Sequence, residues 1–165
     1  MFFWFIATSI WSVWFVFRDP KFDYRLLAIA ALTPDLVDGL LHAFGFAHGA
    51  LHSVVTSIAV LFAIMIATAG RRPSRQRLLA IPIGLFMHLI YDGAFSATKT
   101  FWWPFTGTAL SDESMPSIER GIVNLSLEFF GIVSCIIAWR YFALSDTHRR
   151  RAFLKTGKLN RGDVT

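Results

Sequence analysis

The sequence predicts an all-helical integral membrane protein, a bundle of about five transmembrane helices, and three observations carry this prediction. The chain is 55% hydrophobic and contains 17 Phe and 6 Trp in 165 residues, more than a soluble core of this size needs. The apolar residues form long blocks without the one-sided period of a surface helix. The basic residues lie between and after these blocks, where cytoplasmic loops carry them. We therefore expect a transmembrane bundle over residues 1–144 and a basic cytoplasmic tail over 145–165.

The first two blocks differ in length and in regularity. The first block is about 24 Å long as a helix, which is short for a span, but its tryptophans can anchor both ends. Pro34 interrupts the second block, and Thr33 before it can cap a second half-helix that begins at the proline. The five blocks expected to form helices are 2–17, 26–46, 50–69, 78–97 and 118–144.

The remaining segments are connections, and their charges predict an orientation. Basic residues cluster at 18–25, at 71–77 and in the tail. All three clusters lie in the cytoplasm if the chain crosses five times with its N-terminus outside. The net charge of +5 then follows from topology, and we expect no nucleic-acid partner. The connection at 99–117 opens with Trp102 and Trp103, which we expect in an interfacial aromatic belt, with a lid over a site as the alternative.

Three of the expected helices carry ionisable residues at a similar depth in the outer half of the bundle. Charged groups at this depth are costly unless they pair with one another or bind a metal ion. Within the fourth block two of them stand four residues apart, on one helix face. A mixed set of carboxylates and imidazoles suits zinc, and it also suits manganese or iron. The residues expected to form this metal centre are Asp35, Asp38, His52, His88 and Asp92.

Three more residues are candidates for supporting this centre. His42 follows Asp38 by four residues and shares its helix face, although it lies nearer the outer surface. His48 precedes His52 by one turn and is a ligand, a proton shuttle or an interface residue. Glu128 in the fifth block is a further ligand, an acceptor that supports a ligand histidine, or a helix–helix contact, and we slightly prefer the supporting role.

The order of these motifs resembles a known family. Residues 30–106 are similar to the bacterial membrane-bound metal-dependent hydrolases described as LexA-binding, inner-membrane-associated hydrolases. The motifs that carry the likeness are Pro34-Asp35-x-x-Asp38, His52-Ser53 after a glycine turn, His88-x-x-x-Asp92 and Trp102-Trp103-Pro104-Phe105. Two features depart from the family pattern. The first block has no histidine, and His48 stands where the family has an arginine.

The resemblance implies roles for individual residues. The His88-x-x-x-Asp92 helix also resembles that of the zinc-dependent phospholipases C, and this likeness makes His52, His88 and Asp92 metal ligands. It makes Asp35 a ligand or a water-activating base. Asp35 directly follows Pro34 and lies deeper than Asp38. We therefore expect Asp35 to bind metal, and Asp38 to orient the site or activate water rather than bind metal directly.

These expectations favour a metal-dependent hydrolase in the bacterial cytoplasmic (inner) membrane, with a divalent metal, zinc first, as its cofactor. A lipid-linked ester or phosphoester can enter a site at this depth sideways from the leaflet, so membrane lipids are the expected substrates. Two alternatives remain open. One is a metal transporter without enzymatic activity. The other is a structural or regulatory membrane protein whose polar cluster only fixes helix packing.

Overall fold

The structure is a computed structural model that describes residues 1–19, 21–45, 49–109 and 120–160. Its regular elements are all helical within these ranges, as the sequence predicts. The first helix has the predicted bounds, and the other apolar blocks begin or end within a few residues of the helices observed. The elements are α1 (Phe2–Phe17), α2 (Tyr24–Ala43), η1 (Ala50–His52), α3 (Val54–Ala67), α4 (Arg72–Leu78), α5 (Ala80–Asp92), η2 (Ala94–Ser96), α6 (Thr98–Phe101), α8 (Ile122–Tyr141) and α9 (Thr147–Thr156).

The number of long apolar helices differs from the five that we expected. Among the described residues, two helices are long and apolar enough to cross a membrane, α2 and α8, with 20 residues each. The helices α1, α3 and α5 contain 16, 14 and 13 residues. At 1.5 Å per residue they extend only about 20 to 24 Å, short of the roughly 30 Å of a hydrocarbon core. The apolar blocks are therefore longer than the helices that form within them.

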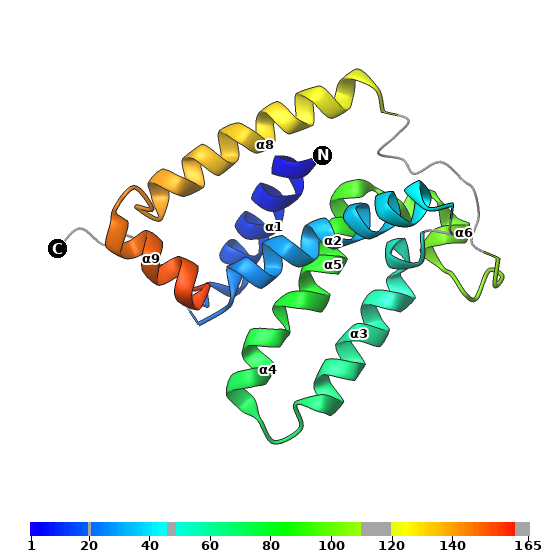
Figure 1. The fold of residues 1–165 in the computed structure, drawn as a ribbon, viewed down its shortest axis with the longest axis horizontal. Coiled ribbons are helices and arrows are strands. Elements are labelled where there is room, and N and C mark those ends of the chain that lie inside the picture. Colours follow the sequence, from blue (N-terminus) through cyan, green and yellow to red (C-terminus); the bar gives the residue numbers. More distant parts are fainter. Residues whose placement is uncertain (20, 46–48, 110–119, 161–165) are drawn as a thin grey trace.

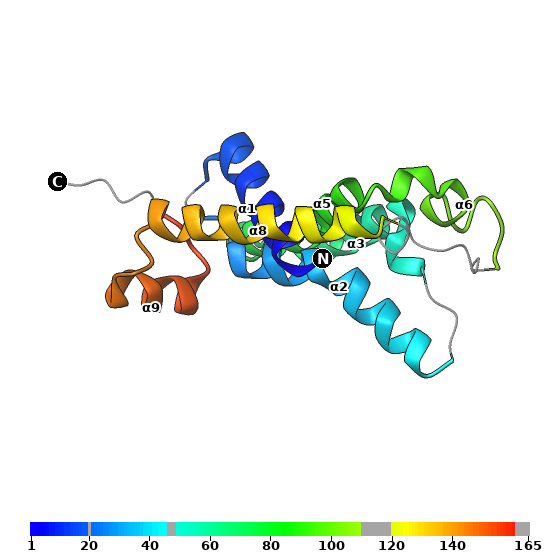
Figure 2. The ribbon, with the colours of Figure 1, turned by 90° about the horizontal axis from the view of Figure 1, so that it is seen from above.

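Two close helix pairs build the body of the molecule: α2 packs on α5, and α1 packs on α8 (Figure 1, Figure 2). A glycine permits each close approach. A Cβ atom at Gly84 in α5 would lie 2.6 Å from the Leu27 carbonyl oxygen of α2, and one at Gly131 in α8 would overlap the backbone of α1 at Trp4. Small residues at such contacts let helix backbones approach closely, as they do in membrane bundles.

Helix α2 runs continuously from Tyr24 to Ala43, with Pro34 inside it. We expected α2 to break into two half-helices at Pro34, and this expectation was wrong. Thr33 does not cap a second segment, because its hydroxyl donates a hydrogen bond back to the Ile29 carbonyl (2.8 Å), as threonines inside helices do. The C-terminal half of α2 projects from the body of the molecule (Figure 2), and this projecting half contains Asp35 and Asp38.

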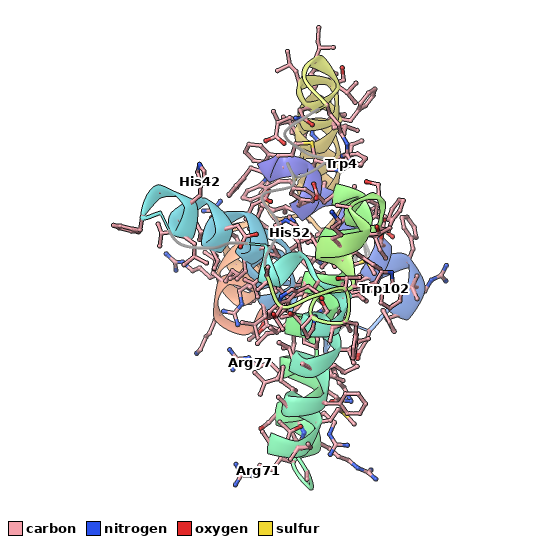
Figure 3. All side chains as sticks on the ribbon, turned by 90° about the vertical axis from the view of Figure 1, so that its right-hand side faces the viewer. Trp4, His42, His52, Arg71, Arg77 and Trp102 are labelled. Carbon is pink, nitrogen blue, oxygen red and sulfur yellow. The ribbon has the colours of Figure 1, made fainter. Side chains whose placement is uncertain are left out.

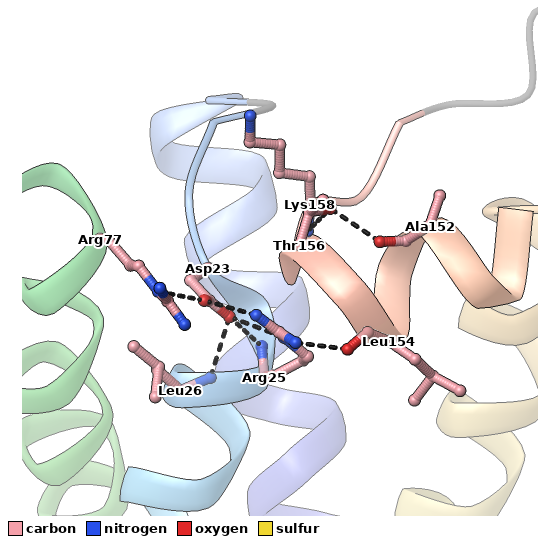
Figure 4. Close-up of polar contacts among 8 residues, drawn as sticks. All are labelled: Asp23, Arg25, Leu26, Arg77, Ala152, Leu154, Thr156 and Lys158. Carbon is pink, nitrogen blue, oxygen red and sulfur yellow. Dashed lines mark hydrogen bonds and ion pairs between the residues drawn. The ribbon is translucent and has the colours of Figure 1, made fainter. Parts of the chain in front are cut away.

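The predicted basic tail is partly a packed element. Helix α9 folds back against the start of α2, where the Tyr24 N–H donates to the Gly157 carbonyl (2.8 Å) and Leu159 is buried in the main core. Asp23 anchors this junction (Figure 4). Its carboxylate caps α2 and forms ion pairs with Arg25 (3.0 Å) and with Arg77 of α4 (3.0 Å). Burial alone would raise the pKa of Asp23, but these hydrogen bonds and charges hold that pKa below its usual value of 3.8.

Much of the surface is apolar. Helix α8 exposes large apolar side chains, including Ile122, Leu125 and Phe129. Only 11% of its most apolar 18-residue stretch is buried inside the protein. Helices α2 and α3 also expose large apolar residues, among them Leu36, Leu40, Phe62 and Ile66. Many exposed large apolar side chains on the same helices are typical of proteins that contact a membrane or a partner.

Candidate metal centre

Three separate segments bring three ligand atoms together. Asp35 comes from α2, His52 ends η1, and His88 lies in α5. The two Nε2 atoms of His52 and His88 are 3.2 Å apart. The Oδ1 atom of Asp35 is 3.5 Å from the Nε2 of His52 and 3.4 Å from the Nε2 of His88. Among the described residues, these three offer ligand atoms that all lie within 4.8 Å of one another, and this group could hold a metal ion.

The second ring nitrogen of each histidine is engaged by a hydrogen-bond acceptor. His88 Nδ1 lies 2.7 Å from the backbone carbonyl oxygen of Ala31, which can only accept. His52 Nδ1 lies 2.7 Å from Oδ2 of Asp38. Each Nδ1 therefore carries the hydrogen, and a neutral ring then has its lone pair on Nε2. Both lone pairs belong to the atoms that meet at the centre of the cluster.

With both rings neutral, this hydrogen-bond pattern offers three acceptor atoms to a cation. Two imidazole lone pairs and a carboxylate oxygen within 3.5 Å are three acceptors, which repel one another unless a positive charge lies between them. Ligand atoms about 2.0 to 2.1 Å from a tetrahedral ion stand roughly 3.3 Å apart. The observed separations of 3.2, 3.4 and 3.5 Å match that spacing. The three residues therefore fit a small tetrahedral cation with one position left over.

The cluster is closed on the histidine side and open on the carboxylate side. The side chains of His52 and His88 are 1% and 0% exposed, whereas that of Asp35 is 36% exposed. The ring of Phe5 from α1 packs on His88, with ring centroids 4.2 Å apart. Solvent therefore reaches the cluster past Asp35, and a fourth ligand would approach from that side.

The other two predicted members of the centre lie next to it. Asp38 is buried, and through its Oδ2 atom it holds the His52 ring, which is the geometry of an orienting residue. Asp92 is fully buried one turn after His88. It does not belong to the group of three whose ligand atoms converge within 4.8 Å.

The three residues expected to support the centre are His42, His48 and Glu128. His42 lies on the exposed last turn of α2, away from His52 (Figure 3). His48 lies outside the described residues. Of the three alternatives for Glu128, the structure shows the helix–helix contact and not the preferred supporting role, because its Oε1 atom accepts from the N–H groups of Phe2 (3.1 Å) and Phe3 (3.0 Å). Glu128 thus satisfies the free N–H groups at the start of α1, as a capping carboxylate does.

Two features of the site escaped the sequence analysis. The first is the Ala31 carbonyl, a backbone group that no residue type marks. Pro34 removes the helical hydrogen bond to the neighbouring Ala30 carbonyl, so it does not identify Ala31.

The second feature is the position of Ser53. Its hydroxyl accepts from the Val55 N–H at the start of α3 and lies 2.5 Å from the Trp103 carbonyl oxygen, to which it donates. These hydrogen bonds hold the connection around Trp103 next to His52, the residue that precedes Ser53.

Comparison with known proteins adds no assignment: no family model, no curated protein and no solved structure matches this chain. The functional interpretation accordingly depends on the geometry of the cluster and on the sequence motifs that form it.

Proposed function

We propose that this protein is a membrane-embedded metal-dependent hydrolase that acts on a lipid-linked ester or phosphoester. One observation carries the proposal. The acceptor atoms of Asp35, His52 and His88 converge at tetrahedral spacing, while both histidines are fixed through Nδ1 in the orientation that metal ligation requires. Zinc is the favoured metal for such a set, and manganese and iron are compatible with the same ligand types.

The number of ligands favours catalysis over a structural role. Structural zinc sites use four protein ligands, whereas catalytic sites use three and keep a position for water or substrate. Among the described residues three converge, and the side of the cluster near Asp35 is open. A divalent metal bound there would polarise a substrate oxygen and lower the pKa of a water molecule.

The residues of the chain would divide the remaining tasks. Asp38 and the Ala31 carbonyl keep the two histidine rings in place, so that little reorganisation accompanies the reaction. The Phe5 ring excludes water from the inner side of His88. Asp38 Oδ1 is buried and accepts no hydrogen bond from the described residues, so it could orient or deprotonate a water that enters the cluster past Asp35.

The substrate class follows from the surroundings of the cluster. Asp35 and Asp38 lie in α2, one of the two helices long and apolar enough to span a membrane, and large apolar side chains of α2 and α3 are exposed nearby. A substrate with an acyl or prenyl chain can therefore reach the open side within the membrane. The resemblance of residues 30–106 to inner-membrane hydrolases agrees with this proposal.

The decisive experiment compares two histidine variants of the purified protein. His88→Ala removes a converging ligand, and we expect it to lower metal affinity by about 10- to 100-fold or more. His42→Ala, on the exposed end of α2, should retain the metal and the activity. Metal content by mass spectrometry and hydrolysis of a panel of phospholipids with labelled ester and phosphoester bonds are the two measurements. Equal metal content in both variants would remove the metal centre from this proposal.

A non-enzymatic reading has one observation in its favour. The separations of 3.2 to 3.5 Å also fall within the range of hydrogen bonds and ion pairs, so a proton in place of the metal would let the cluster hold α2, η1 and α5 together. Purified wild-type protein that contains no metal after growth in zinc would support this structural role. Bound metal without hydrolysis, together with zinc uptake into proteoliposomes, would instead support a transporter.

A further inference from the structure

A cavity of about 640 Å³ is lined by residues from the end of α1, the segment after α8, and α9 with the residues that follow it. Helix α9 lies at the opposite end of the molecule from α6 (Figure 1). Three of the residues that line the cavity are permanent cations from three separate segments. Arg18 ends α1, Arg149 lies in α9, and Lys158 follows α9, with His148 beside them. Within the part of the chain that the structure describes, no acidic side chain lines the cavity.

The floor of the cavity is apolar and firmly packed. It is formed by Trp14, Phe142, Leu144 and Leu159. Phe142 and Leu159 are each only 2% exposed, and the Trp14 and Phe142 rings meet edge to face with centroids 4.8 Å apart. An apolar floor beneath a rim of cations matches a ligand that combines an anionic group with a hydrocarbon chain.

The position of the cavity selects one such ligand. Phe142 directly follows α8, the more apolar of the two candidate spans, so the cavity lies where that helix would leave the hydrocarbon core. Phospholipid headgroups are found at that depth, and basic residues next to a span attract anionic lipids. Asp146 lies next to the rim in the sequence, and its carboxylate caps α9 by accepting from the Arg149 backbone N–H (2.8 Å).

We propose that this cavity binds the phosphate headgroup of an anionic phospholipid, with Arg149 and Lys158 contacting the phosphate and the aromatic floor contacting the start of the acyl chains. The site is independent of the metal centre. It depends only on the part of the proposed function that places α8 in a membrane, so loss of hydrolase activity would not affect it.

The test is native mass spectrometry of the detergent-purified chain, titrated with dioleoyl-phosphatidylglycerol and with dioleoyl-phosphatidylcholine. We expect tighter binding of the anionic lipid. The double variant R149Q/K158Q should weaken that binding by roughly 10- to 30-fold, because a basic side chain near an anionic headgroup contributes about a fivefold factor. The matched control R151Q/K155Q removes the same charge from exposed positions that do not line the cavity, and it should change binding by less than about threefold.

A second variant tests the cavity without altering its charge. Ala152 lines the cavity and is exposed, so Ala152→Trp should place an indole ring in the space beside the cations and weaken phosphatidylglycerol binding although every cation remains. Retained binding in this variant overturns the proposal, as does an equal loss in the two double variants or equal affinity for the two lipids. Glycerol 3-phosphate that displaces the lipid at equal concentration would show a soluble phosphate site and would also overturn the lipid assignment.

Discussion

At the scale of single residues, Asp38 is the carboxylate whose role can be separated most sharply from metal ligation. Its Oδ2 atom accepts the hydrogen of His52 Nδ1 at 2.7 Å. In Asp38→Asn the amide oxygen can still accept this hydrogen, so we expect most of the metal to remain. Asp38→Ala removes the acceptor and should lower metal affinity by about 10- to 100-fold.

The rate of hydrolysis provides a second measurement on the Asp38 variants. If Asp38 also deprotonates water, Asp38→Asn should lose about 10²- to 10⁴-fold in rate while it keeps its metal. Metal titration and rate measurement on the same preparations separate the two effects. Unchanged metal affinity in Asp38→Ala would show that the hydrogen bond to His52 does not support the site.

The sequence predicted the central residues of the cluster because each one is an ionisable group inside an apolar block. Asp35, His52 and His88 could therefore be grouped by depth alone. His42 could not be excluded in this way, because helical spacing gives the face of a residue but not the position where the cluster ends. His42 lies seven residues beyond Asp35, about 10 Å further along the axis, on the exposed end of α2.

At the scale of helices, the contact between α2 and α5 sets the position of His88 relative to Asp35. Gly84 stands four residues before His88, and a Cβ there would lie 2.6 Å from the Leu27 carbonyl and 2.7 Å from the Ala30 Cβ. Gly84→Ala should therefore push the helices apart and cost about 1 to 3 kcal/mol of unfolding free energy. It should also weaken metal binding, because His88 would move away from α2.

Gly39 provides the matched control within α2. A Cβ there meets nothing within 4 Å, so Gly39→Ala should keep the metal and stabilise the helix by about 0.5 to 1 kcal/mol. Thermal unfolding in detergent and metal titration test both variants. Equal stability and equal metal affinity in the two would contradict the assignment of the close contact to Gly84.

The helices themselves were largely predictable, and their ends were less so. Apolar blocks mark where helices form, but the blocks do not show that a 3₁₀ turn at Ala50–His52 precedes α3 or that α5 ends at Asp92. The capping role of Asp23 was detectable, since an aspartate before an apolar run is a helix-start signal. Its proximity to Arg77, which is 54 residues later, depends on tertiary packing.

At the scale of the whole molecule, the junction around Asp23 makes stability depend on acid. The folded-state pKa of Asp23 lies below its usual 3.8, so ionised Asp23 stabilises the fold. This contribution is complete above the unfolded-state pKa and is lost as pH falls through the lower folded-state value. Thermal unfolding from pH 6 to pH 2.5 should show a decline below about pH 4 that is weaker in Asp23→Asn. Parallel curves for the two proteins would contradict this linkage.

The orientation of the chain is a separate whole-molecule prediction. In a Cys135→Ala background, a cysteine at Thr108 should react with an impermeant thiol reagent added outside intact cells, because the aromatic connection is expected outside. A cysteine at Ser74, within the basic helix α4, should react only after the cells are opened. The reverse pattern would invert the topology.

The unequal exposure of the three converging residues also predicts the route by which a metal ion would enter and leave the site. Both histidines are sealed within the protein, and Asp35 is the partly open member of the set. Loading and removal should therefore proceed by exchange at the carboxylate while the imidazoles stay in place. A small chelator should strip the ion with kinetics that depend on Asp35, and the stripped protein, with its histidine rings still held through Nδ1, should reload without refolding.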